Sequence, residues 1–540
     1  MKKKLILAMS LCGCAAVCVD AQTLHVVSDG VDYAFPSSQT GEMTYKDGES
    51  LTVMGKTFVL SDVSRMYVDD SEVADNLVLV NYGSASASVT VAGNVARYVS
   101  PVVTGAHVII VQSESVSDDT CGEITYTLSG SSSDGGFTLE GSYKATVELA
   151  GLTLKNPSGA ALDIQDGKRI DLSVKKGTEN TLADMASGEQ KGCIACKGHL
   201  EIKGKGTLNV YGNTAHGIHS KEYVEMKNCT LNILSAVKDG INCNQYFLME
   251  SGELNVSGVG DDGIQVSYKD DTDREAEDTG AFTMDGGTIN VSVTAASSKG
   301  VKAIGNIDIN GGSVNVTTTG KESEGIESKA VLTINDGTIV VAATDDAINS
   351  ASHMYIKGGD ITVVSSGNDG LDSNGNMYIS GGVIRAFGTR APECGIDANE
   401  EEGYTVIFTG GTLLAVGGGN SVPSTSESTQ PYVSASMSVA AGNEIAVKSG
   451  DTVLASFTVP SNYSSSSSSA GGFGGRMGFG PGGQGGPGGG GQGGQGSTGS
   501  VLVSCAGLVS GSSYTMTCGT SSSSVTAALK GSNGGGGRPW

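Results

Sequence analysis

Aromatic and basic side chains are both scarce in this sequence of 540 residues. Phe, Trp and Tyr make up 5% of it and Trp occurs once, whereas glycine occurs 82 times. This composition favours stacked turns over a globule built around an aromatic core. Lys and Arg number 33 against 57 Asp and Glu, which gives a formal net charge of −24 at pH 7. Because nucleic acids and anionic membranes bind basic surfaces, we expect neither of them as a partner.

Long apolar runs are absent after residue 21, so the sequence predicts no integral membrane segment. Before that point, lysines at residues 2–4 precede an apolar run over 5–19 and the small residue Ala21. This order is typical of a signal peptide over residues 1–21, and it predicts a protein that is secreted or held at the cell surface. Residues 11–14, Leu-Cys-Gly-Cys, resemble a lipobox, so a lipoprotein is the alternative to simple cleavage near Ala21.

Signatures of common enzyme sites are also missing. The sequence contains no nucleophile elbow and no phosphate-binding loop. His216 and His219 are close in sequence, but they lie in a repeated turn motif, where a structural role is the default. These absences favour binding over catalysis.

A short motif returns along the middle of the chain: an acidic residue, Gly, Ile, a polar residue and a small residue. Most of its intervals are 23 or 25 residues, and one of 37 residues contains an acidic insertion at 268–278. The glycine position is held by Gly217, Gly240, Gly263, Gly300, Gly325, Ala347, Gly370 and Gly395. A repeat this short has the length of one solenoid coil rather than of a domain.

Each repeat has the pattern of strand, turn, strand and turn. In residues 288–293, Thr-Ile-Asn-Val-Ser-Val, apolar residues alternate with polar ones, which is the period of a strand with one buried face. Because β-branched residues dominate and no helical stretch separates the strands, each strand should pair with its copies in the neighbouring coils. We therefore predict an all-β fold, a right-handed parallel β-helix over residues 121–428.

The segments on both sides lack the repeat. Residues 22–120 contain short β runs between Gly and Asp turns, which predict one or two small N-terminal β modules. Residues 429–540 predict a C-terminal β cap, interrupted by a Ser- and Gly-rich tract over 464–500 that is too poor in apolar residues to fold. A solenoid needs such caps at both ends because the edges of its terminal strands are otherwise exposed.

Several stretches resemble a known protein family. They are Ala-Thr-Val-Glu-Leu-Ala-Gly-Leu-Thr-Leu at 145–154, the segments 159–164 and 177–182, the later Asp-Gly-Ile coils, and 508–517. These stretches are similar to bacterial secreted, calcium-associated carbohydrate-binding β-helix proteins, relatives of the pectate-lyase fold that bind cellulose and acidic-sugar polymers. The resemblance implies a parallel β-helix, calcium as a cofactor and a polysaccharide as a partner.

Acidic side chains recur around the motif glycine. Stacked coils would bring the residue before the glycine, and the residue two after it, into columns about 4.8 Å apart, where neighbouring coils can share calcium. The candidate calcium ligands are Asp239, Asp261, Asp262, Asp345, Asp346, Asp369, Asp372 and Asp397. Glu324 and Glu327 fall in the same columns. The alternative is that these side chains accept hydrogen bonds from backbone N–H groups of the turns.

Outward side chains on the longer strands are candidates for carbohydrate contact. The candidates are Asn232, Asn255 and Asn290 in one column, Tyr355 and Tyr378 in another, and the nearby Arg385 and Arg390. Amides can bond a polymer's hydroxyl groups, tyrosines can stack on sugar rings, and arginines can pair with uronate carboxylates. The alternatives are that the stacked amides bond one another and that the C-terminal segment covers the tyrosines.

Cysteines after the leader mostly fall in small-residue columns. Cys196, Ser220 and Cys243 share one such column, which is typical of buried thiols in stacked turns. Cys505 and Cys518 differ, because they flank a short Gly/Ser turn on two expected antiparallel strands. This pair is the candidate disulfide.

These patterns and the resemblance together predict a non-catalytic protein that binds a plant-type or acidic polysaccharide in the presence of calcium. The first alternative is a calcium-dependent polysaccharide lyase of the pectate-lyase type, in which Asp369, Asp372 and an arginine would take part. The second alternative is a structural or adhesive surface protein. Nothing in the sequence specifies the sugar or an oligomeric state.

Overall fold

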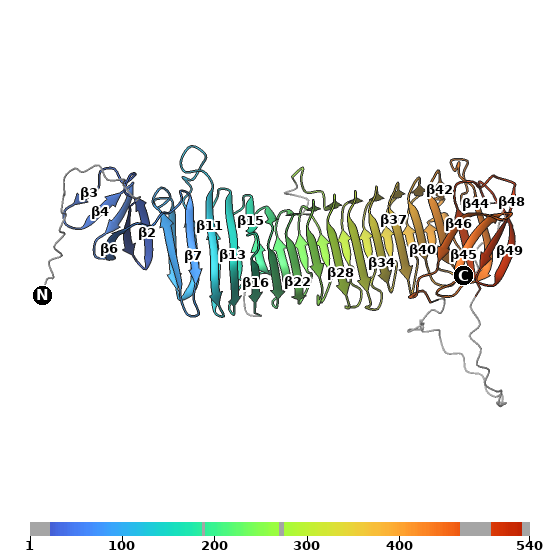
Figure 1. Ribbon diagram of the computed structural model, residues 1–540, viewed down its shortest axis with the longest axis horizontal. Helices are drawn as coiled ribbons and strands as arrows, with labels where there is room; N and C mark the ends of the chain where they lie inside the picture. The colour runs from blue at the N-terminus through green and yellow to red at the C-terminus, as the bar shows by residue number, and fades with distance from the viewer. Residues whose placement is uncertain (1–21, 186–189, 269–274, 465–497, 532–540) are drawn as a thin grey trace, which may run out of the picture.

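The computed structural model describes residues 22–185, 190–268, 275–464 and 498–531. It is an elongated, nearly all-β molecule in which a long solenoid separates two smaller β regions (Figure 1). The one helix among the described residues is a 3-10 turn at Glu400–Glu402. No described helix has the length and hydropathy to cross a membrane. The predicted leader at 1–21 and nearly all of the tract predicted at 464–500 lie outside the described residues.

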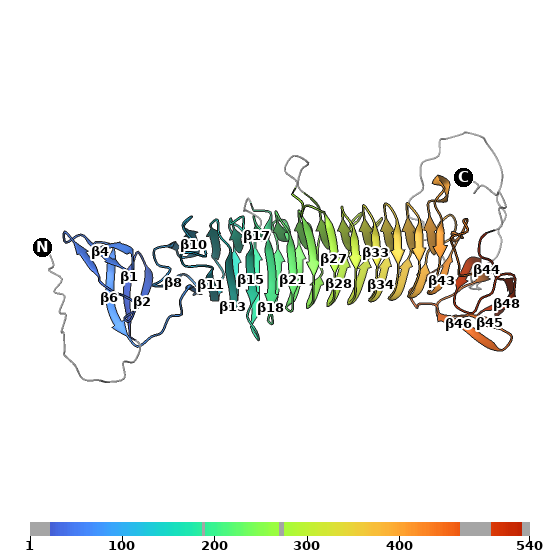
Figure 2. The ribbon, with the colours of Figure 1, turned by 90° about the horizontal axis from the view of Figure 1, so that it is seen from above.

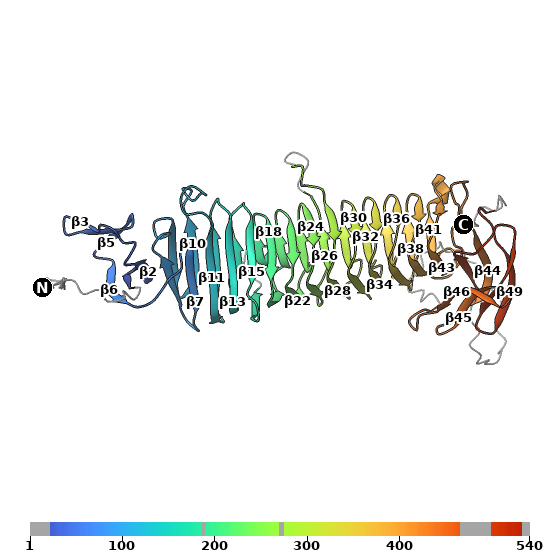
Figure 3. The ribbon, with the colours of Figure 1, turned by 45° about the horizontal axis from the view of Figure 1, so that its top comes forward.

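The solenoid confirms the parallel β-helix, but each coil holds three strands rather than the two predicted. The first strand of each coil belongs to a 13-stranded sheet, called ladder 1 here and visible in Figure 3. Its strands are β9 (Val99–Thr104), β10 (Ala106–Gln112), β12 (Gly135–Glu140), β14 (Leu162–Ile164), β17 (Gly192–Cys196), β20 (His216–Ser220), β23 (Ile241–Cys243), β26 (Ile264–Val266), β29 (Val301–Ala303), β32 (Ile326–Ser328), β35 (Ile348–Ser350), β38 (Leu371–Ser373) and β41 (Ile396–Ala398).

The other two strands of each coil form two further parallel ladders within a 29-stranded sheet. Ladder 2 (Figure 2) contains β15 (Ile170–Val174), β18 (Leu200–Gly204), β21 (Val224–Lys227), β24 (Tyr246–Met249), β27 (Ala281–Met284), β30 (Ile307–Ile309), β33 (Leu332–Ile334), β36 (Met354–Ile356), β39 (Met377–Ile379) and β42 (Val406–Phe408). Ladder 3 contains β16 (Glu179–Asp184), β19 (Thr207–Gly212), β22 (Thr230–Ala236), β25 (Glu253–Val256), β28 (Thr288–Val293), β31 (Ser313–Thr318), β34 (Thr338–Ala343), β37 (Asp360–Ser365), β40 (Val383–Phe387) and β43 (Thr412–Gly417).

The repeated motif lies in ladder 1 and not in a turn, which corrects the prediction. In the coil that begins at Gly240, the glycine is followed directly by β23. A Cβ at Gly240 would lie 2.6 Å from the carbonyl oxygen of Gly263 and 2.6 Å from Cγ1 of Val256, so the close approach of neighbouring coils excludes a side chain. A strand of three residues is too short to show alternation, and for that reason its sequence resembles a turn.

Inward side chains of the three ladders form one continuous core. In ladder 3, Leu231, Leu254 and Ile289 pair in register and are fully buried. Burial of one such side chain contributes about 1.5–3 kcal/mol, so a column repeated over many coils is the main source of stability. In ladder 1, Cys196, Ser220 and Cys243 pair in register as predicted.

At the N-terminal end, β1 (Thr23–Ser28) pairs with β2 (Val31–Pro36) and β6 (Val63–Asp69), next to a small sheet of β3 (Thr44–Lys46), β4 (Ser50–Val53) and β5 (Lys56–Val59). β7 (Leu77–Tyr82) and β8 (Ala87–Ala92) form a hairpin. β7 then pairs in parallel with β11 (Ile124–Ser132), and β10 with β12. β11 pairs with β13 (Ala145–Asn156), which bridges ladders 2 and 3. Parallel pairing therefore begins before residue 121.

At the other end, β43 pairs antiparallel with β47 (Thr498–Ser504), which also pairs with β44 (Tyr432–Ser438). A separate four-stranded sheet contains β45 (Glu444–Ser449), β46 (Thr452–Thr458), β48 (Ser513–Cys518) and β49 (Ser521–Thr526). These strands share an apolar cluster with Phe387, Leu414 and Val416 of the last coils.

The disulfide predicted between Cys505 and Cys518 is wrong. Both cysteines are buried free thiols. Cys505 follows β47 in the 29-stranded sheet, whereas Cys518 ends β48 in the four-stranded sheet, so the two do not face each other across a hairpin. The thiol of Cys518 instead donates to the carbonyl oxygen of Ser438 at 3.3 Å.

Candidate functional site

The next-to-last residue of the ladder 1 strands from β17 to β41 forms a column along the solenoid. This residue stands two positions after the motif glycine, and the strand register aligns its copies: Ala195, His219, Asn242, Gln265, Lys302, Glu327, Asn349, Asp372 and Asp397. The column is acidic in the late coils. Two aligned carboxylates, Asp372 and Asp397, end it.

The acids before the glycine are buried and accept hydrogen bonds from the backbone of the next coil. Oδ1 of Asp239 accepts from the N–H of Asp262 at 3.2 Å, and Oδ1 of Asp346 accepts from the N–H of Asp369 at 3.0 Å. Oδ1 of Asp369 accepts from the N–H of Cys394. The predicted structural role of these side chains therefore holds. It occupies one oxygen of each carboxylate. The second oxygens of Asp239 and Asp346 accept hydrogen bonds from Nδ2 of Asn242 at 2.8 Å and from Nδ2 of Asn349 at 3.2 Å.

Three acids meet in the late coils, and we call Asp369, Asp372 and Asp397 the late cluster. One carboxylate oxygen of each lies within 4.8 Å of the others. Calcium–oxygen distances are about 2.3–2.6 Å, so two oxygens on one ion lie up to about 5 Å apart. The spacing of the late cluster suits shared coordination of one cation.

Burial and mutual repulsion raise the pKa values of these acids. Burial is the largest cause, and with the negative charge of Asp346 it raises the pKa of Asp369 to about 9. Burial and Asp372 raise the pKa of Asp346 to about 8, and burial and Asp397 raise that of Asp372 to about 7. Such raised values mean that the ionised forms are poorly stabilised by their surroundings, and a divalent cation would stabilise them.

Two glutamates continue the acidic positions into the neighbouring coil. Oε2 of Glu324 and Oε2 of Glu327 are buried without a hydrogen-bond partner. Burial raises the pKa of Glu324 to about 7, with Glu327 as the largest charged contributor, and Glu324 in turn raises the pKa of Asp372. Their other oxygens are already paired with lysines: Nζ of Lys299 is 3.4 Å from Oε1 of Glu324, and Lys329 forms an ion pair with Glu327. Every donor on offer is a carboxylate oxygen, the hard donor that calcium prefers.

An early cluster of Asp239, Asp261 and Asp262 has equally close oxygens. A lysine and a histidine already lie beside it, however. Nζ of Lys302 is 3.5 Å from Oδ2 of Asp262, and Nδ1 of His216 is 3.2 Å from Oδ2 of Asp239. Burial raises the pKa of Asp262 to about 6, and Lys302 opposes this rise. The early cluster therefore has less uncompensated negative charge for a cation to neutralise than the late cluster has.

Asp345, the remaining candidate ligand, stands apart from both clusters. Its Oδ1 accepts a hydrogen bond from Nδ2 of Asn368 at 2.8 Å. The sequence grouped Asp345 with Asp346 because the two are adjacent, but consecutive residues point in different directions.

The candidate asparagines form a hydrogen-bonded ladder. Nδ2 of Asn255 donates to Oδ1 of Asn232 at 2.9 Å, and Nδ2 of Asn290 donates to Oδ1 of Asn255 at 2.8 Å. The ladder continues to Asn209 on one side and Asn315 on the other. The amides thus bond one another, as the structural alternative predicted, and Nδ2 of Asn255 also donates to Oε1 of Glu253 at 3.1 Å.

Tyr355 and Tyr378 pair in register, and their rings are stacked with centroids 4.8 Å apart and planes within 4°. The ring faces are turned along the column, so the edges rather than the faces are open to a sugar. Arg385 forms an ion pair with Asp360, and Arg390 lies exposed in the loop between β40 and β41.

The structure does not bring the three groups of candidates together. The acids lie on ladder 1, the tyrosines on ladder 2, and Asn232, Asn255, Asn290 and Arg385 on ladder 3. A linear polymer that runs along one ladder cannot contact all three groups. The sequence could not show this because it did not reveal the third strand of each coil.

Comparison with known proteins places the chain in a family. A family model described as a carbohydrate-binding domain-containing protein matches residues 115–370 and 319–469, more than half of the chain. No curated protein matches the chain. A solved structure of the polysaccharide lyase-like protein from C. thermocellum, a gadolinium derivative, is 21% identical and covers 48% of this chain and 96% of that chain, with a TM-score of 0.39. The chain belongs to the family of carbohydrate-binding domain-containing proteins.

Proposed function

We propose that this protein is secreted or held at the cell surface, where it binds an acidic polysaccharide with the help of calcium. The observation that carries the proposal is the late cluster, in which one carboxylate oxygen each of Asp369, Asp372 and Asp397 lies within 4.8 Å of the others. The family match supports a carbohydrate as the partner. The sequence of residues 1–21 supports export.

Calcium would connect the two acidic partners. When bound, it supplies positive charge that the carboxylates of the protein and of a uronic-acid polymer can share. The residues that would hold it are those of the late cluster, with Asp346 next to them. The exposed surface of ladder 1 would then carry the polymer.

We propose binding without cleavage. A lyase of the pectate-lyase type needs an arginine or lysine base next to the metal and the sugar, in a form that can accept a proton. Arg385 is held by Asp360 on ladder 3, whereas the late cluster lies on ladder 1. The proposal therefore assigns no catalytic role to Arg385.

Retention on immobilised polysaccharides tests this proposal. Columns of polygalacturonate, alginate and cellulose are compared in calcium and in chelator, and ultraviolet absorbance of unsaturated products is followed in parallel. We expect retention on at least one acidic polymer in calcium, release by chelator, and no unsaturated product. Equal retention with and without calcium would contradict the calcium requirement, and unsaturated products would favour the lyase.

A further inference from the structure

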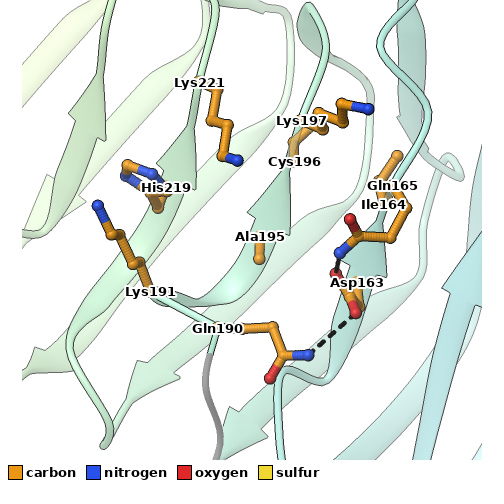
Figure 4. Close-up of a pocket in the computed structure, with 10 residues that line it drawn as sticks. All are labelled: Asp163, Ile164, Gln165, Gln190, Lys191, Ala195, Cys196, Lys197, His219 and Lys221. Carbon is orange, nitrogen blue, oxygen red and sulfur yellow. Dashed lines mark hydrogen bonds between the residues drawn. The ribbon is translucent and has the colours of Figure 1, made fainter.

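The early coils of ladder 1 carry a groove that is basic although the protein is strongly acidic. A cavity of about 280 Å³ adjoins one of about 420 Å³, and both are lined by Lys191, Lys197, Lys221 and His219. Figure 4 shows the three lysines around the first cavity, with His219 next to Lys191. Small-molecule sites commonly have volumes of about 300–1,000 Å³.

The three lysines come from two neighbouring coils. Lys191 precedes β17, while Lys197 and Lys221 directly follow β17 and β20. All three are exposed, and none has an ion-pair partner among the residues that the structure describes. By contrast, Lys175 in ladder 2 is 3.2 Å from Glu148, and Lys227 pairs with Glu250. The groove thus concentrates positive charge that is free to meet an anion.

The acidic groups in the lining are already engaged. Asp163 is buried and accepts hydrogen bonds from Nε2 of Gln190 at 3.1 Å and from Nε2 of Gln165. Glu222 lies 4.0 Å from Nε2 of His199, on the side of ladder 2. Neither carboxylate forms an ion pair with the lysines.

His219 adds a hydrogen-bond acceptor to the groove. Its Nδ1 is 3.0 Å from Oδ1 of Asn242, whose Nδ2 donates to Gln265 and Asp239. Because the amide oxygen can only accept, Nδ1 carries the proton and Nε2 holds a lone pair. Burial, then His216, and also Lys191 and Lys221 lower the pKa of His219 to about 4, so the ring is neutral at pH 7. A neutral acceptor beside three ammonium groups suits a ligand that has both an anionic group and a hydroxyl.

We propose that this groove is a calcium-independent subsite for an acidic sugar, in which the lysines bind the anionic group and Nε2 of His219 accepts a hydroxyl. The inference rests on the proposed function, because it assigns the groove to the same class of polymer as the late cluster. Six strand steps separate β20 from β38 in ladder 1, or about 29 Å at 4.8 Å each. A polymer along ladder 1 spans both sites, whereas a disaccharide reaches only one.

Binding of a disaccharide in chelator isolates the groove from the calcium site. The full-length protein is titrated with digalacturonate, a sulfated disaccharide and cellobiose, by calorimetry in EDTA. The groove variant is Lys191→Gln with Lys197→Gln and Lys221→Gln. The matched control is Lys175→Gln with Lys205→Gln and Lys227→Gln, which removes the same charge from ladder 2. His219→Leu keeps the ammonium groups and removes the acceptor.

We expect the wild-type protein and the control to bind an acidic disaccharide, and the groove variant to bind it at least about tenfold more weakly. His219→Leu should also weaken binding, and cellobiose should show no difference between the proteins. The digalacturonate and sulfated arms distinguish a carboxylate from a sulfate ligand. Equal binding by the groove variant, or no acidic disaccharide binding by the wild-type protein, would overturn the inference.

Failure of the two proposals can be told apart. If the groove variant loses disaccharide binding while polymer retention is independent of calcium, the subsite stands and the calcium requirement fails. If the groove variant keeps disaccharide binding while retention still requires calcium, the subsite fails and the proposed function stands.

Discussion

Two regions of ladder 1 share a backbone architecture and differ in charge. Around β17 and β20, Lys191, Lys197 and Lys221 surround a groove. Around β38 and β41, Asp369, Asp372 and Asp397 crowd their carboxylates together. Both sets occupy the motif positions or the residues next to them. The repeat therefore fixes the positions of the side chains, whereas the residue type at each position decides which ions and sugars a coil can bind.

The largest expected effect is the loss of calcium affinity when the late cluster is neutralised. Asp369→Asn with Asp372→Asn should weaken calcium binding by about 100-fold or more, because two charged ligands are lost. Asparagine keeps an oxygen that can accept the N–H of Cys394, so the fold should persist. Calorimetric titration with calcium measures the effect.

Its control is the pair Asp261→Asn with Asp262→Asn in the early cluster. Lys302 already compensates that cluster, so calcium affinity should change by less than about threefold. If the early pair of substitutions weakened calcium binding more than the late pair, the calcium site would lie in the early cluster, which contradicts the assignment to the late cluster.

The second effect is a fall in stability with rising pH when calcium is absent. The pKa values of Asp369, Asp346 and Asp372 are raised from 3.8 to about 9, 8 and 7. A raised folded pKa means that the stabilisation is complete below about pH 4 and is lost as pH rises toward 9. The midpoint of thermal unfolding in chelator should therefore fall by about 5 °C or more between pH 5 and pH 8.5.

Calcium should reverse this fall, and more strongly at pH 8.5 than at pH 5, because protons compete for the same oxygens. Thermal unfolding at both pH values, with and without calcium, provides the check. A midpoint that is independent of pH in chelator would show that the late carboxyls have ordinary pKa values.

The repeat and the identity of its columns could be predicted from the sequence. The Asn232, Asn255 and Asn290 column and the Tyr355 and Tyr378 pair align as their spacing indicated, because parallel in-register strands repeat the sequence period directly. The raised pKa values could not be predicted, since they depend on burial that spacing does not report.

The third strand of each coil was also not predicted. The motif strands such as β23 and β38 hold three residues each, too few for a hydrophobic period. Without that third ladder, the acids, tyrosines and asparagines looked like neighbours on one or two faces. The basic groove was missed for a similar reason, because Lys191 meets Lys197 and Lys221 only when two coils are stacked.

The third effect is a gain in stability from one late-cluster substitution. Asp372→Asn removes a charge that repels Asp346, so the calcium-free protein should gain about 1–2 kcal/mol at pH 8. Asp308→Asn on ladder 2, whose column neighbours are Thr283 and Thr333, should change stability by less than about 0.5 kcal/mol. Chemical denaturation in chelator compares the two, and loss of stability in Asp372→Asn would contradict the repulsion.

The smallest effect on binding is expected from the asparagine ladder. Asn255→Ala breaks the hydrogen bonds that Asn255 donates to Asn232 and Glu253 and the one that it accepts from Asn290, which should cost about 1–2 kcal/mol of stability. Calcium affinity and disaccharide binding should not change, because ladder 3 lies on another face. A large loss of glycan binding in this variant would move the polymer from ladder 1 to ladder 3.

The most direct test of the calcium site is a crystal structure of the protein from crystals grown in the presence of calcium. The account predicts an ion between the carboxylates of Asp369, Asp372 and Asp397, with calcium–oxygen distances of about 2.3–2.6 Å. An ion held only at Asp239, Asp261 and Asp262, or a late cluster that binds no ion in saturating calcium, would contradict it.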